Sequence, residues 1–287
     1  MILITSEFVK FKLQNLTERC SQLKKKQINP KLCVILAGNN PASLSYVKKK
    51  IELTKQIGAD SELIHLDENI NLEDFLKIID LKNKDHTING ILIQLPLALH
   101  LNLCSVKDII NPIKDIDCFH QNNYAQIYDH NDLKKNRIRP CTPGGIIDFL
   151  NWNKFPFEGS LALVIGRSNL VGKPLVHFLN EQNATVIWCH SKTKNLVELT
   201  KLADLIVSAT GTPKLITKDH LNSKKTQYVI DVGTSKVNSK ICGDVDPSLL
   251  IMDDLKNTHI TPVPGGVGPL TVTTLMENLI SMCEFSC

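Results

Sequence analysis

The sequence predicts an α/β protein of two domains. Short apolar runs alternate with helix-like segments over residues 31–95, and the alternation restarts at residue 161, after a polar and basic stretch at 129–139. Strands separated by helices are typical of parallel βαβ units, so each half should contain its own sheet. A length of 287 residues with 43% hydrophobic content suits two domains of ordinary size.

The first half predicts three strands and two helices. In chain order, we expect a strand at 32–36, a helix at 41–57, a strand at 61–66, a helix at 72–82 and a strand at 88–95. Asn40 is a good N-cap and Pro41 suits the first helical position, while Gly58 closes the same helix. These signals fix the phase of the first helix.

Lys50 lies on the apolar side of that helix. At about 100° per residue, the lysine is surrounded by Leu44, Tyr46, Val47, Ile51, Leu53 and Ile57. A lone lysine in such a position is more often a snorkelling side chain. Tyr46 favours a functional role, because it lies four residues earlier on the same face. A desolvated lysine has a lowered pKa and can act as a general acid or base.

Two further polar residues follow predicted elements of the first half. Gln94 ends the strand at 88–95, and ligands of open α/β sheets bind at the carboxyl ends of strands. Asp117 lies in a proline-containing loop after a helix. Taken alone, either side chain would be an ordinary loop residue or cap.

The second half predicts four buried strands, at residues 161–165, 184–189, 204–208 and 228–232. The segment from Gly166 through Arg167 and Ser168 to Gly172 follows the first of these strands and opens a helix, as a dinucleotide-binding turn does. Serine occupies the middle glycine position, so this pattern alone is a weak signal.

The end of the second strand favours NADP over NAD. An NAD site usually has an acidic residue there, which bonds the ribose hydroxyls. Here the strand runs into His190, Ser191 and Lys192 with no acidic residue before Lys194. Hydroxyls and cations at this position, together with Arg167, suit a 2′-phosphate.

A loop rich in proline and glycine, residues 261–269, precedes the last predicted helix. Backbone without side chains beside a helix N-terminus suits close approach to a flat or anionic ligand. A plain linker is the alternative, although strong apolar segments bracket the loop. We expect the helix at residues 270–280, started by threonine capping.

The composition excludes several classes of protein. A formal charge of +4 with lysines spread along the chain does not predict a nucleic-acid interface. No apolar run reaches the roughly 20 residues of a membrane span, and the N-terminus lacks signal-peptide features, so we expect a cytoplasmic protein. Nine scattered cysteines without a CxxC pattern indicate buried reduced thiols, with neither a metal site nor disulfides.

Several motifs, read in order, resemble the bifunctional methylenetetrahydrofolate dehydrogenase/cyclohydrolase family. They extend from about residue 38 to 278 and are Asn40-Pro41-Ala42-Ser43 with Tyr46-Val47 and Lys50, Gln94-Leu95-Pro96-Leu97, Lys114-Asp115-Ile116-Asp117, Pro140-Cys141-Thr142-Pro143-Gly144-Gly145, Gly166-Arg167-Ser168 to Val171-Gly172, Cys189-His190-Ser191, Gly243-Asp244-Val245-Asp246 and the loop at 261–269.

The resemblance implies a reaction, a cofactor and a domain plan. Such enzymes oxidise 5,10-methylenetetrahydrofolate with NADP and hydrolyse the methenyl product to 10-formyltetrahydrofolate. Residues 1–140 would form the folate-binding catalytic domain, to which a C-terminal helix at 270–287 returns. Residues 141–269 would form a Rossmann-like NADP domain, and the protein would be a homodimer.

The resemblance also implies roles for single residues. Lys50 would be the catalytic lysine, Gln94 would tune it, Tyr46 would pack on the folate and Asp117 would hold the pterin edge. Substrate contacts would include Pro264, Gly265 and Gly266. Cofactor contacts would come from Gly166, Arg167, Ser168, Gly172, His190, Ser191, Thr210, Gly211, Val232, Gly233 and Thr234.

The chain departs from the family pattern at several points. Cys118 stands where glycine is usual after Asp117, Ala98 replaces a proline, and Thr234-Ser235 replaces Ile-Asn. An N-terminal Asp-Gly-Lys signature is absent from residues 1–12. None of these changes removes a reacting group. Two alternatives stay open: an NADP-dependent dehydrogenase of another small substrate, such as a shikimate-type alcohol, and a catalytically silent nucleotide-binding homologue.

Overall fold

The computed structural model describes residues 1–101, 108–128, 138–237, 240–252 and 255–285. The chain forms two compact units, which we call the three-stranded unit (residues 11–141 and 272–287) and the five-stranded unit (residues 1–10 and 142–271). The boundary between them falls inside the helices α1 (Ser6–Lys25), α6 (Cys141–Trp152) and α9 (Val267–Phe285).

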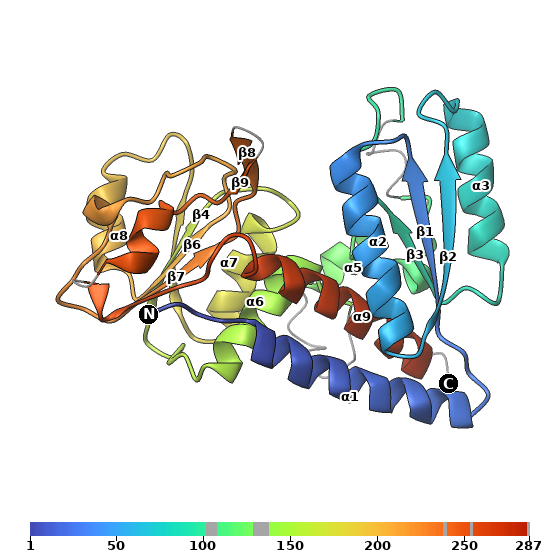
Figure 1. The fold of residues 1–287 in the computed structure, drawn as a ribbon, viewed down its shortest axis with the longest axis horizontal. Coiled ribbons are helices and arrows are strands. Elements are labelled where there is room, and N and C mark those ends of the chain that lie inside the picture. Colours follow the sequence, from blue (N-terminus) through green and yellow to red (C-terminus); the bar gives the residue numbers. More distant parts are fainter. Residues whose placement is uncertain (102–107, 129–137, 238–239, 253–254, 286–287) are drawn as a thin grey trace. The chain divides into compact units, whose positions relative to one another are not determined.

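The three-stranded unit is a parallel sheet with a helix in each crossover. The strands β1 (Lys31–Ala37), β2 (Asp60–Leu66) and β3 (Gly90–Ile93) lie in the order β2-β1-β3. Helix α2 (Pro41–Gln56) joins β1 to β2, and α3 (Leu72–Lys84) joins β2 to β3 (Figure 1). Phe75 and Ile79 of α3 are fully buried against the sheet, which explains why the strands read as apolar runs.

A short loop region extends this sheet beyond β3. The 3₁₀ helix η1 (Pro112–Lys114) leads into Asp115, which forms a parallel bridge with Ile91 of β3. Helix α5 (Gln121–Gln126) follows, capped by the His120 ring, which accepts a hydrogen bond from the backbone N–H of Asn122. The bridge places the segment that carries Asp117 beside the end of β3.

The five-stranded unit is a second parallel sheet with the order β10-β7-β6-β4-β5. Its strands are β4 (Leu161–Ile165), β5 (Thr185–Cys189), β6 (Leu205–Ser208), β7 (Gln227–Asp231) and β10 (Thr258–Ile260). The crossovers contain α7 (Gly172–Glu181), α8 (Leu196–Leu202), and the 3₁₀ helices η3 (Lys218–His220) and η4 (Pro247–Ile251), with a hairpin of β8 (Ser235–Val237) and β9 (Lys240–Cys242) after β7. The two-domain α/β prediction is confirmed.

Two details of the predicted elements are wrong. Strand β5 is not buried, because it is the edge strand, and Thr185 and Trp188 are exposed there. Helix α9 begins at Val267 rather than near Leu270, so threonine capping does not start it. Pro269 lies in the first turn of the helix, where its missing N–H has no intrahelical partner to lose. The hydroxyl of Thr271 bonds the Val267 carbonyl within the helix instead.

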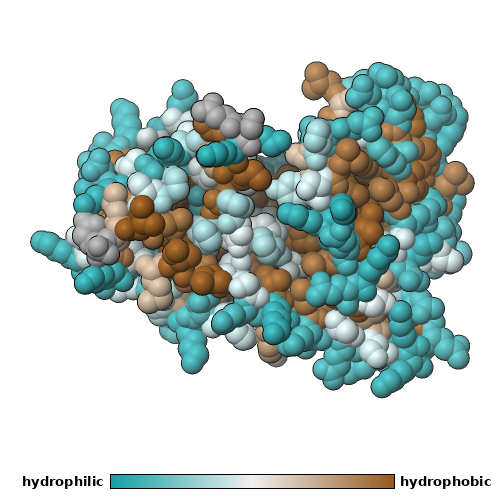
Figure 2. Space-filling model, viewed as in Figure 1, coloured by the Kyte–Doolittle hydropathy of each residue, from teal (hydrophilic) through white to brown (hydrophobic). Residues whose placement is uncertain are grey.

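Charged side chains cover the outer faces of the helices. Hydrophilic side chains predominate over α1 and α3 in the space-filling view (Figure 2). On α3, Lys77 pairs with Glu73 at 2.8 Å and Lys84 with Asp80 at 2.6 Å, so positive and negative groups alternate there. No helix within the described residues is both long and apolar enough to cross a membrane. Of the seven described cysteines, all free, six are buried and Cys242 is partly buried.

Candidate active site

The position of Lys50 follows from the start of α2. Asn40 Oδ1 accepts hydrogen bonds from the backbone N–H groups of Ala42 (2.9 Å) and Ser43 (3.3 Å), and Pro41 is the first helical residue. This cap sets the helix phase. It leaves Lys48 and Lys49 exposed, whereas Lys50 is half-buried.

Lys50 is hydrogen-bonded to Gln94. The Lys50 Nζ donates to Gln94 Oε1 at 3.0 Å, and Gln94, just after β3, is buried. The Gln94 Nε2 donates to the Leu95 carbonyl at 2.6 Å, which turns the amide oxygen towards the lysine. Burial lowers the pKa of Lys50, and the negative charge of Asp117 opposes part of that shift. Desolvation thus brings the neutral form of the amine closer to physiological pH than in an exposed lysine.

Asp117 lies in the loop after η1, between the buried residues Ile116 and Cys118. Two residues before it, the fully buried Asp115 accepts hydrogen bonds from the backbone N–H groups of Phe119 (3.0 Å) and His120 (2.8 Å) and from the amide of Asn123 (2.9 Å). Asp115 is thus a loop anchor, which sequence reasoning noted only as part of a motif. Asp117 itself is half-buried, and its carboxylate acts on the charge states of Lys50 and Cys141.

Cys118 occupies a left-handed backbone position. Its φ is +60°, a region that favours glycine. The buried thiol donates to the Ile138 carbonyl at 3.6 Å. A glycine would adopt this conformation without strain, and here a cysteine adopts it with its thiol buried.

Tyr46 lies one turn before Lys50 on α2, with 40% of its surface exposed. Spacing of four residues puts both side chains on one face of the helix. The three-stranded unit therefore gathers Tyr46, Lys50, Gln94 and Asp117 from α2, the end of β3 and the loop after η1. Gln94 and Lys50 are in direct contact.

The turn from β4 into α7 requires its glycines. Gly166 has a φ of +127°, and a Cβ built there would lie 2.5 Å from the Ala209 carbonyl oxygen. A Cβ on Gly172 would lie 2.3 Å from the Gly166 carbonyl oxygen. Ser168, at the middle position of the pattern, uses its hydroxyl to accept hydrogen bonds from the backbone N–H groups of Val171 (3.2 Å) and Gly172 (3.4 Å). The Ser168 hydroxyl thus stabilises the turn that leads into α7.

Hydrogen bonds between side chains and backbone stabilise the turn after β5. The His190 N–H donates to Thr193 Oγ1 at 2.9 Å, and His190 Nδ1 accepts from the Lys192 N–H at 3.1 Å. Trp188 Nε1 donates to the Gly166 carbonyl at 2.8 Å, which links this strand to the glycine turn. Arg167 and Ser191 are both exposed.

The loops after β6 and β7 are held by two buried aspartates that sequence reasoning did not assign. Asp244 Oδ2 accepts from the Ser208 hydroxyl (2.7 Å), the Thr210 N–H (2.7 Å) and the Thr210 hydroxyl (2.9 Å). Asp231 accepts from the backbone N–H groups of Gly233, Asp244 and Val245 at 2.9–3.1 Å. The motif Gly243-Asp244 was the available signal.

Glycines make room for these carboxylates. A Cβ on Gly233 would lie 1.9 Å from Asp244 Oδ1, and one on Gly243 would lie 1.9 Å from Asp231 Oδ2. The Ser235 hydroxyl, at a position where the chain departs from the family pattern, donates to the Gly211 carbonyl at 2.7 Å. It thereby ties the β6 and β7 loops together.

The cofactor residues expected from the sequence follow the ends of neighbouring strands. Ile165 pairs with Cys189 and with Ser208, and Ser208 pairs with Asp231, so the four strands end at one level. The residues that follow these ends are Gly166, Arg167, Ser168 and Gly172 after β4, His190 and Ser191 after β5, Thr210 and Gly211 after β6, and Val232, Gly233 and Thr234 after β7.

The loop before α9 is fixed in the same five-stranded unit. Thr5 Oγ1 donates to the carbonyls of Gly265 (2.8 Å) and Gly266 (3.2 Å). Gly265 has a φ of +100°, and a Cβ on Gly266 would lie 2.4 Å from the Pro262 carbonyl oxygen. Pro264 and Gly265 are exposed, so this loop presents backbone rather than side chains. Over the described ranges, no cluster of His, Cys, Asp and Glu could hold a metal ion.

Comparison with known proteins matches both halves of the chain. Residues 5–117 match the family model for the tetrahydrofolate dehydrogenase/cyclohydrolase catalytic domain, and residues 140–287 match the model for the NAD(P)-binding domain of the same enzymes. The bifunctional protein FolD of Bacillus cereus (strain G9842) is 44% identical over 287 residues, which cover 99% of this chain and 96% of that protein.

Solved structures agree over the whole length. The bifunctional enzyme FolD of Campylobacter jejuni is 37% identical with a TM-score of 0.92, covering 100% of this chain and 99% of that one. The Trypanosoma brucei FolD, complexed with NADP cofactor and an inhibitor, is 30% identical with a TM-score of 0.90, covering 100% and 98%. The chain therefore belongs to the tetrahydrofolate dehydrogenase/cyclohydrolase family, as its motifs suggested, and is an enzyme with those two activities.

Proposed function

We propose that the protein oxidises 5,10-methylenetetrahydrofolate with NADP and hydrolyses the methenyl product to 10-formyltetrahydrofolate, with Lys50 as the catalytic residue of the hydrolysis. The observation that carries this assignment is the 3.0 Å hydrogen bond between Lys50 Nζ and Gln94 Oε1 on a half-buried helix face. Desolvation there lowers the pKa of the amine, as proton transfer near neutral pH requires.

In the hydrolysis, a water molecule adds to the carbon that bridges the two folate nitrogens. Lys50 Nζ accepts a proton from this water and returns it to the nitrogen that departs when the carbon–nitrogen bond breaks. Gln94 orients the lysine, because its own Nε2 is engaged by the Leu95 carbonyl and only its oxygen faces the amine. The net reaction consumes one water and releases one proton.

Asp117 and Tyr46 bind the substrate in this scheme. A carboxylate can accept two parallel hydrogen bonds from the amino and ring N–H groups of a pterin, which fixes orientation as well as affinity. Asp117 is half-buried, so its oxygens retain access to a ligand. Tyr46 offers an exposed ring on the face that carries Lys50. Pro264 and Gly265 offer the substrate a strip of exposed backbone, and the buried Gly266 lets the loop pass close to the Pro262 carbonyl.

The cofactor is NADP, which supplies the hydride acceptor when bound. The fit rests on the turn at Gly166 and Gly172, where a Cβ would collide with backbone, so the chain can approach a pyrophosphate closely. Arg167 and Ser191 are exposed and can hold a 2′-phosphate, and no acidic residue stands between Cys189 and Lys194 to repel it.

The proposed folate and NADP contacts correspond to two domains. We propose residues 1–140 with 270–287 as the folate domain and residues 141–269 as the NADP domain, although residues 1–10 and 270–271 pack with the five-stranded unit. The family resemblance further supports a cytoplasmic location and a homodimer. Sedimentation of the purified protein would test the dimer. No observation favours a dehydrogenase of another substrate or a silent homologue.

A spectrophotometric assay tests the proposal. Addition of 5,10-methylenetetrahydrofolate and NADP to the enzyme should produce NADPH and a transient methenyl absorbance that decays by hydrolysis. Turnover with NAD as efficient as with NADP would contradict the cofactor assignment. NADPH formation without decay of the methenyl product above its spontaneous rate would contradict the role of Lys50.

A further inference from the structure

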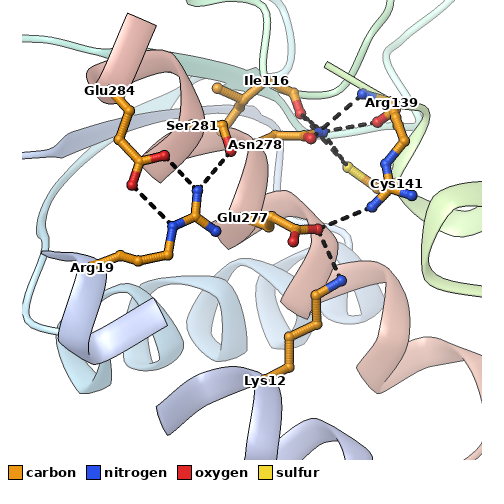
Figure 3. Close-up of polar contacts among 9 residues, drawn as sticks. All are labelled: Lys12, Arg19, Ile116, Arg139, Cys141, Glu277, Asn278, Ser281 and Glu284. Atoms are coloured by element: carbon orange, nitrogen blue, oxygen red, sulfur yellow. Dashed lines mark hydrogen bonds and ion pairs between the residues drawn. The ribbon is translucent and has the colours of Figure 1, made fainter. Parts of the chain in front are cut away.

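Asn278, on α9, bonds two segments that flank the proposed folate residues. Only 3% of its surface is exposed. Its Nδ2 donates to the carbonyls of Ile116 and Arg139, each at 2.8 Å, and lies 3.6 Å from the Cys141 sulfur (Figure 3). Its Oδ1 accepts from the Arg139 N–H at 3.4 Å. The amide thus pairs with the Arg139 backbone as a neighbouring strand would, and uses its second N–H for Ile116.

The two bonded segments also contact each other. Cys141 Sγ donates to the Ile116 carbonyl at 3.6 Å, and Cys118 Sγ donates to the Ile138 carbonyl at 3.6 Å. Asp117 stands between Ile116 and Cys118, so the residues on either side of it are fixed. Asn278 is the donor common to the Ile116 carbonyl and the Arg139 carbonyl.

The same stretch of α9 also contacts the helix that carries Lys50. Thr54 Oγ1 donates to the Lys50 carbonyl at 2.8 Å and lies 3.3 Å from the Met276 sulfur, and both contacts are buried or partly buried. Met276 is two residues before Asn278. Helix α9 therefore contacts both the helix that carries Lys50 and the loop that carries Asp117.

Ion pairs hold α9 in place along this stretch. Glu277 pairs with Lys12 at 2.8 Å and with Arg139 at 3.1 Å. Seven residues further along each helix, Arg19 pairs with Glu284 at 2.6 Å, and it also donates to the Ser281 hydroxyl at 3.0 Å (Figure 3). The pairs with Lys12 and Arg19 hold α9 against α1, and Asn278 bonds α9 to the Ile116 and Arg139 carbonyls.

We propose that Asn278 is a positioning residue of the folate site, which sets the place of the Asp117 carboxylate relative to the Lys50 amine. The inference rests on the roles proposed above for Asp117 and Lys50. A buried amide that only supported the fold would lower stability without altering kinetics. A positioning residue alters the folate KM and the hydrolysis rate and leaves NADP binding unchanged.

The first test is Asn278→Ser, which removes both N–H donors and leaves space for a water molecule. The folate KM should rise about tenfold, the size expected when a buried charged group shifts relative to its ligand. The KM for NADP should stay within about twofold. Asn278→Asp, of the same size, should show the same pattern more strongly if it folds, and Asn278→Ser decides the question if it does not.

Asn83→Ser is the matched control. Asn83, on α3, also pairs its amide with a loop backbone, donating to the Ile109 carbonyl and accepting from the Asn111 N–H. Its variant should lower the thermal midpoint and leave the folate KM unchanged. Equal kinetic effects of the Asn278 and Asn83 variants, or none from Asn278→Ser, would overturn the proposal.

A double variant separates this inference from the proposed function. If Asn278 acts through Asp117, the folate KM of Asn278→Ser with Asp117→Ala should match that of Asp117→Ala alone. Multiplication of the two effects would overturn the positioning role while the role of Asp117 stands. No change of KM in Asp117→Ala would instead refute the pterin contact on which the inference rests.

Discussion

The two units of the molecule build their sites in opposite ways. In the three-stranded unit the candidate chemistry lies in side chains: the amine of Lys50, the amide of Gln94 and the carboxylate of Asp117. In the five-stranded unit the proposed NADP site depends mainly on backbone shape, at positions such as Gly166 and Gly172 where no side chain fits, with Arg167 and Ser191 proposed only for the 2′-phosphate.

Buried charged groups occur in both units, and they differ in how fully they are bonded. Asp231 accepts three backbone N–H groups, and one oxygen of Asp244 accepts three donors. Within the described residues, the only hydrogen bond of Lys50 Nζ goes to Gln94. Burial alone therefore does not identify a reactive group. Lys50 Nζ has donors left for a ligand, whereas the donors on Asp231 and on Asp244 Oδ2 come from the loops that these aspartates support. Asp244 Oδ1 has no hydrogen-bond partner among the described residues, but it is buried, so an unused acceptor indicates a ligand site only where it is accessible.

The largest expected effect is the loss of hydrolysis in Lys50→Met. A positioned general acid or base contributes about 10² to 10⁴ in rate, so cyclohydrolase turnover should fall by at least about a hundredfold. NADP binding should be unchanged, because Lys50 lies in the three-stranded unit and NADP is proposed to bind the five-stranded unit. Methenyltetrahydrofolate decay measures the first quantity and the NADP KM the second.

Lys49→Met is the control for this variant. Lys49 is the exposed neighbour on α2, and its loss should leave both activities intact. Undiminished hydrolysis in Lys50→Met would refute the assignment of the reaction to side chains of this unit.

The second largest effect is expected from Gly172→Ala. The new Cβ would lie 2.3 Å from the Gly166 carbonyl oxygen, and both partners are backbone, so the turn must move. The affinity for NADP should fall by about a hundredfold, on the scale of 1.4 kcal/mol per tenfold. Cofactor binding measured by titration, without folate, tests this directly.

Gly159→Ala controls for the general cost of changing a glycine. Gly159 has a φ of +73°, and its Cβ would meet open space, so that variant should lose about 1 kcal/mol of stability through backbone strain. It should bind NADP normally. Normal cofactor binding by Gly172→Ala would show that the backbone shape of the turn is not what the site requires.

Arg167→Ala should have a smaller and more selective effect. A charge-assisted hydrogen bond contributes about 1.5 to 3 kcal/mol, so the KM for NADP should rise by about one to two powers of ten. The KM for NAD, which lacks the 2′-phosphate, should hardly change. Because Arg167 is exposed, added salt should weaken the preference for NADP in the wild type. Equal losses for both nucleotides would place Arg167 outside the 2′-phosphate site.

Much of the fold was predictable because its signals are local. The Asn40-Pro41 start of α2 fixed the helix phase, and with it the unusual place of Lys50. Strand β5 was predicted as buried because its apolar residues resemble those of its neighbours. Whether a strand lies at the edge of a sheet depends on strand order, which a single segment does not contain.

The parts of the site that escaped prediction depend on contacts between distant segments. Asp231 and Asp244 are 13 residues apart and become one unit only when the chain returns between β7 and η4. Asn278 bonds a carbonyl 162 residues earlier, and nothing in the helix pattern around it marks that contact. Asp115 and Asp117 look alike in sequence, and only the hydrogen bonds to Asp115 identify it as the anchor.

The last expected effect is on stability rather than activity: the free energy of unfolding should depend on pH with opposite sign for one carboxylate in each unit. Burial, with repulsion from Asp244, raises the pKa of Asp231 to about 6. An unfolded aspartate has a pKa of about 3.9, so between these values the folded protein binds more protons than the unfolded chain. The contribution of Asp231 to the free energy of unfolding is therefore greatest below about pH 4. It should fall by about 2 to 3 kcal/mol as the pH rises to 6 and stay constant above.

Glu62, on β2, should behave in the opposite way. Hydrogen bonds from Lys82 and Lys31 lower its pKa, so its contribution to the free energy of unfolding is present above the unfolded value near 4.3 and is lost as the pH falls.

Unfolding by urea at pH 4.5 and pH 7 should be compared for the wild type, Asp231→Asn and Glu62→Gln. Both tryptophans of the chain, Trp152 and Trp188, belong to the five-stranded unit, so their fluorescence follows the unfolding that Asp231 affects, and far-UV circular dichroism follows both units. The stability lost in Asp231→Asn should be larger at the lower pH, and that lost in Glu62→Gln larger at the higher pH. A difference between wild type and Asp231→Asn that does not vary with pH would mean that this carboxylate stays ionised throughout, and that its three N–H donors outweigh its burial.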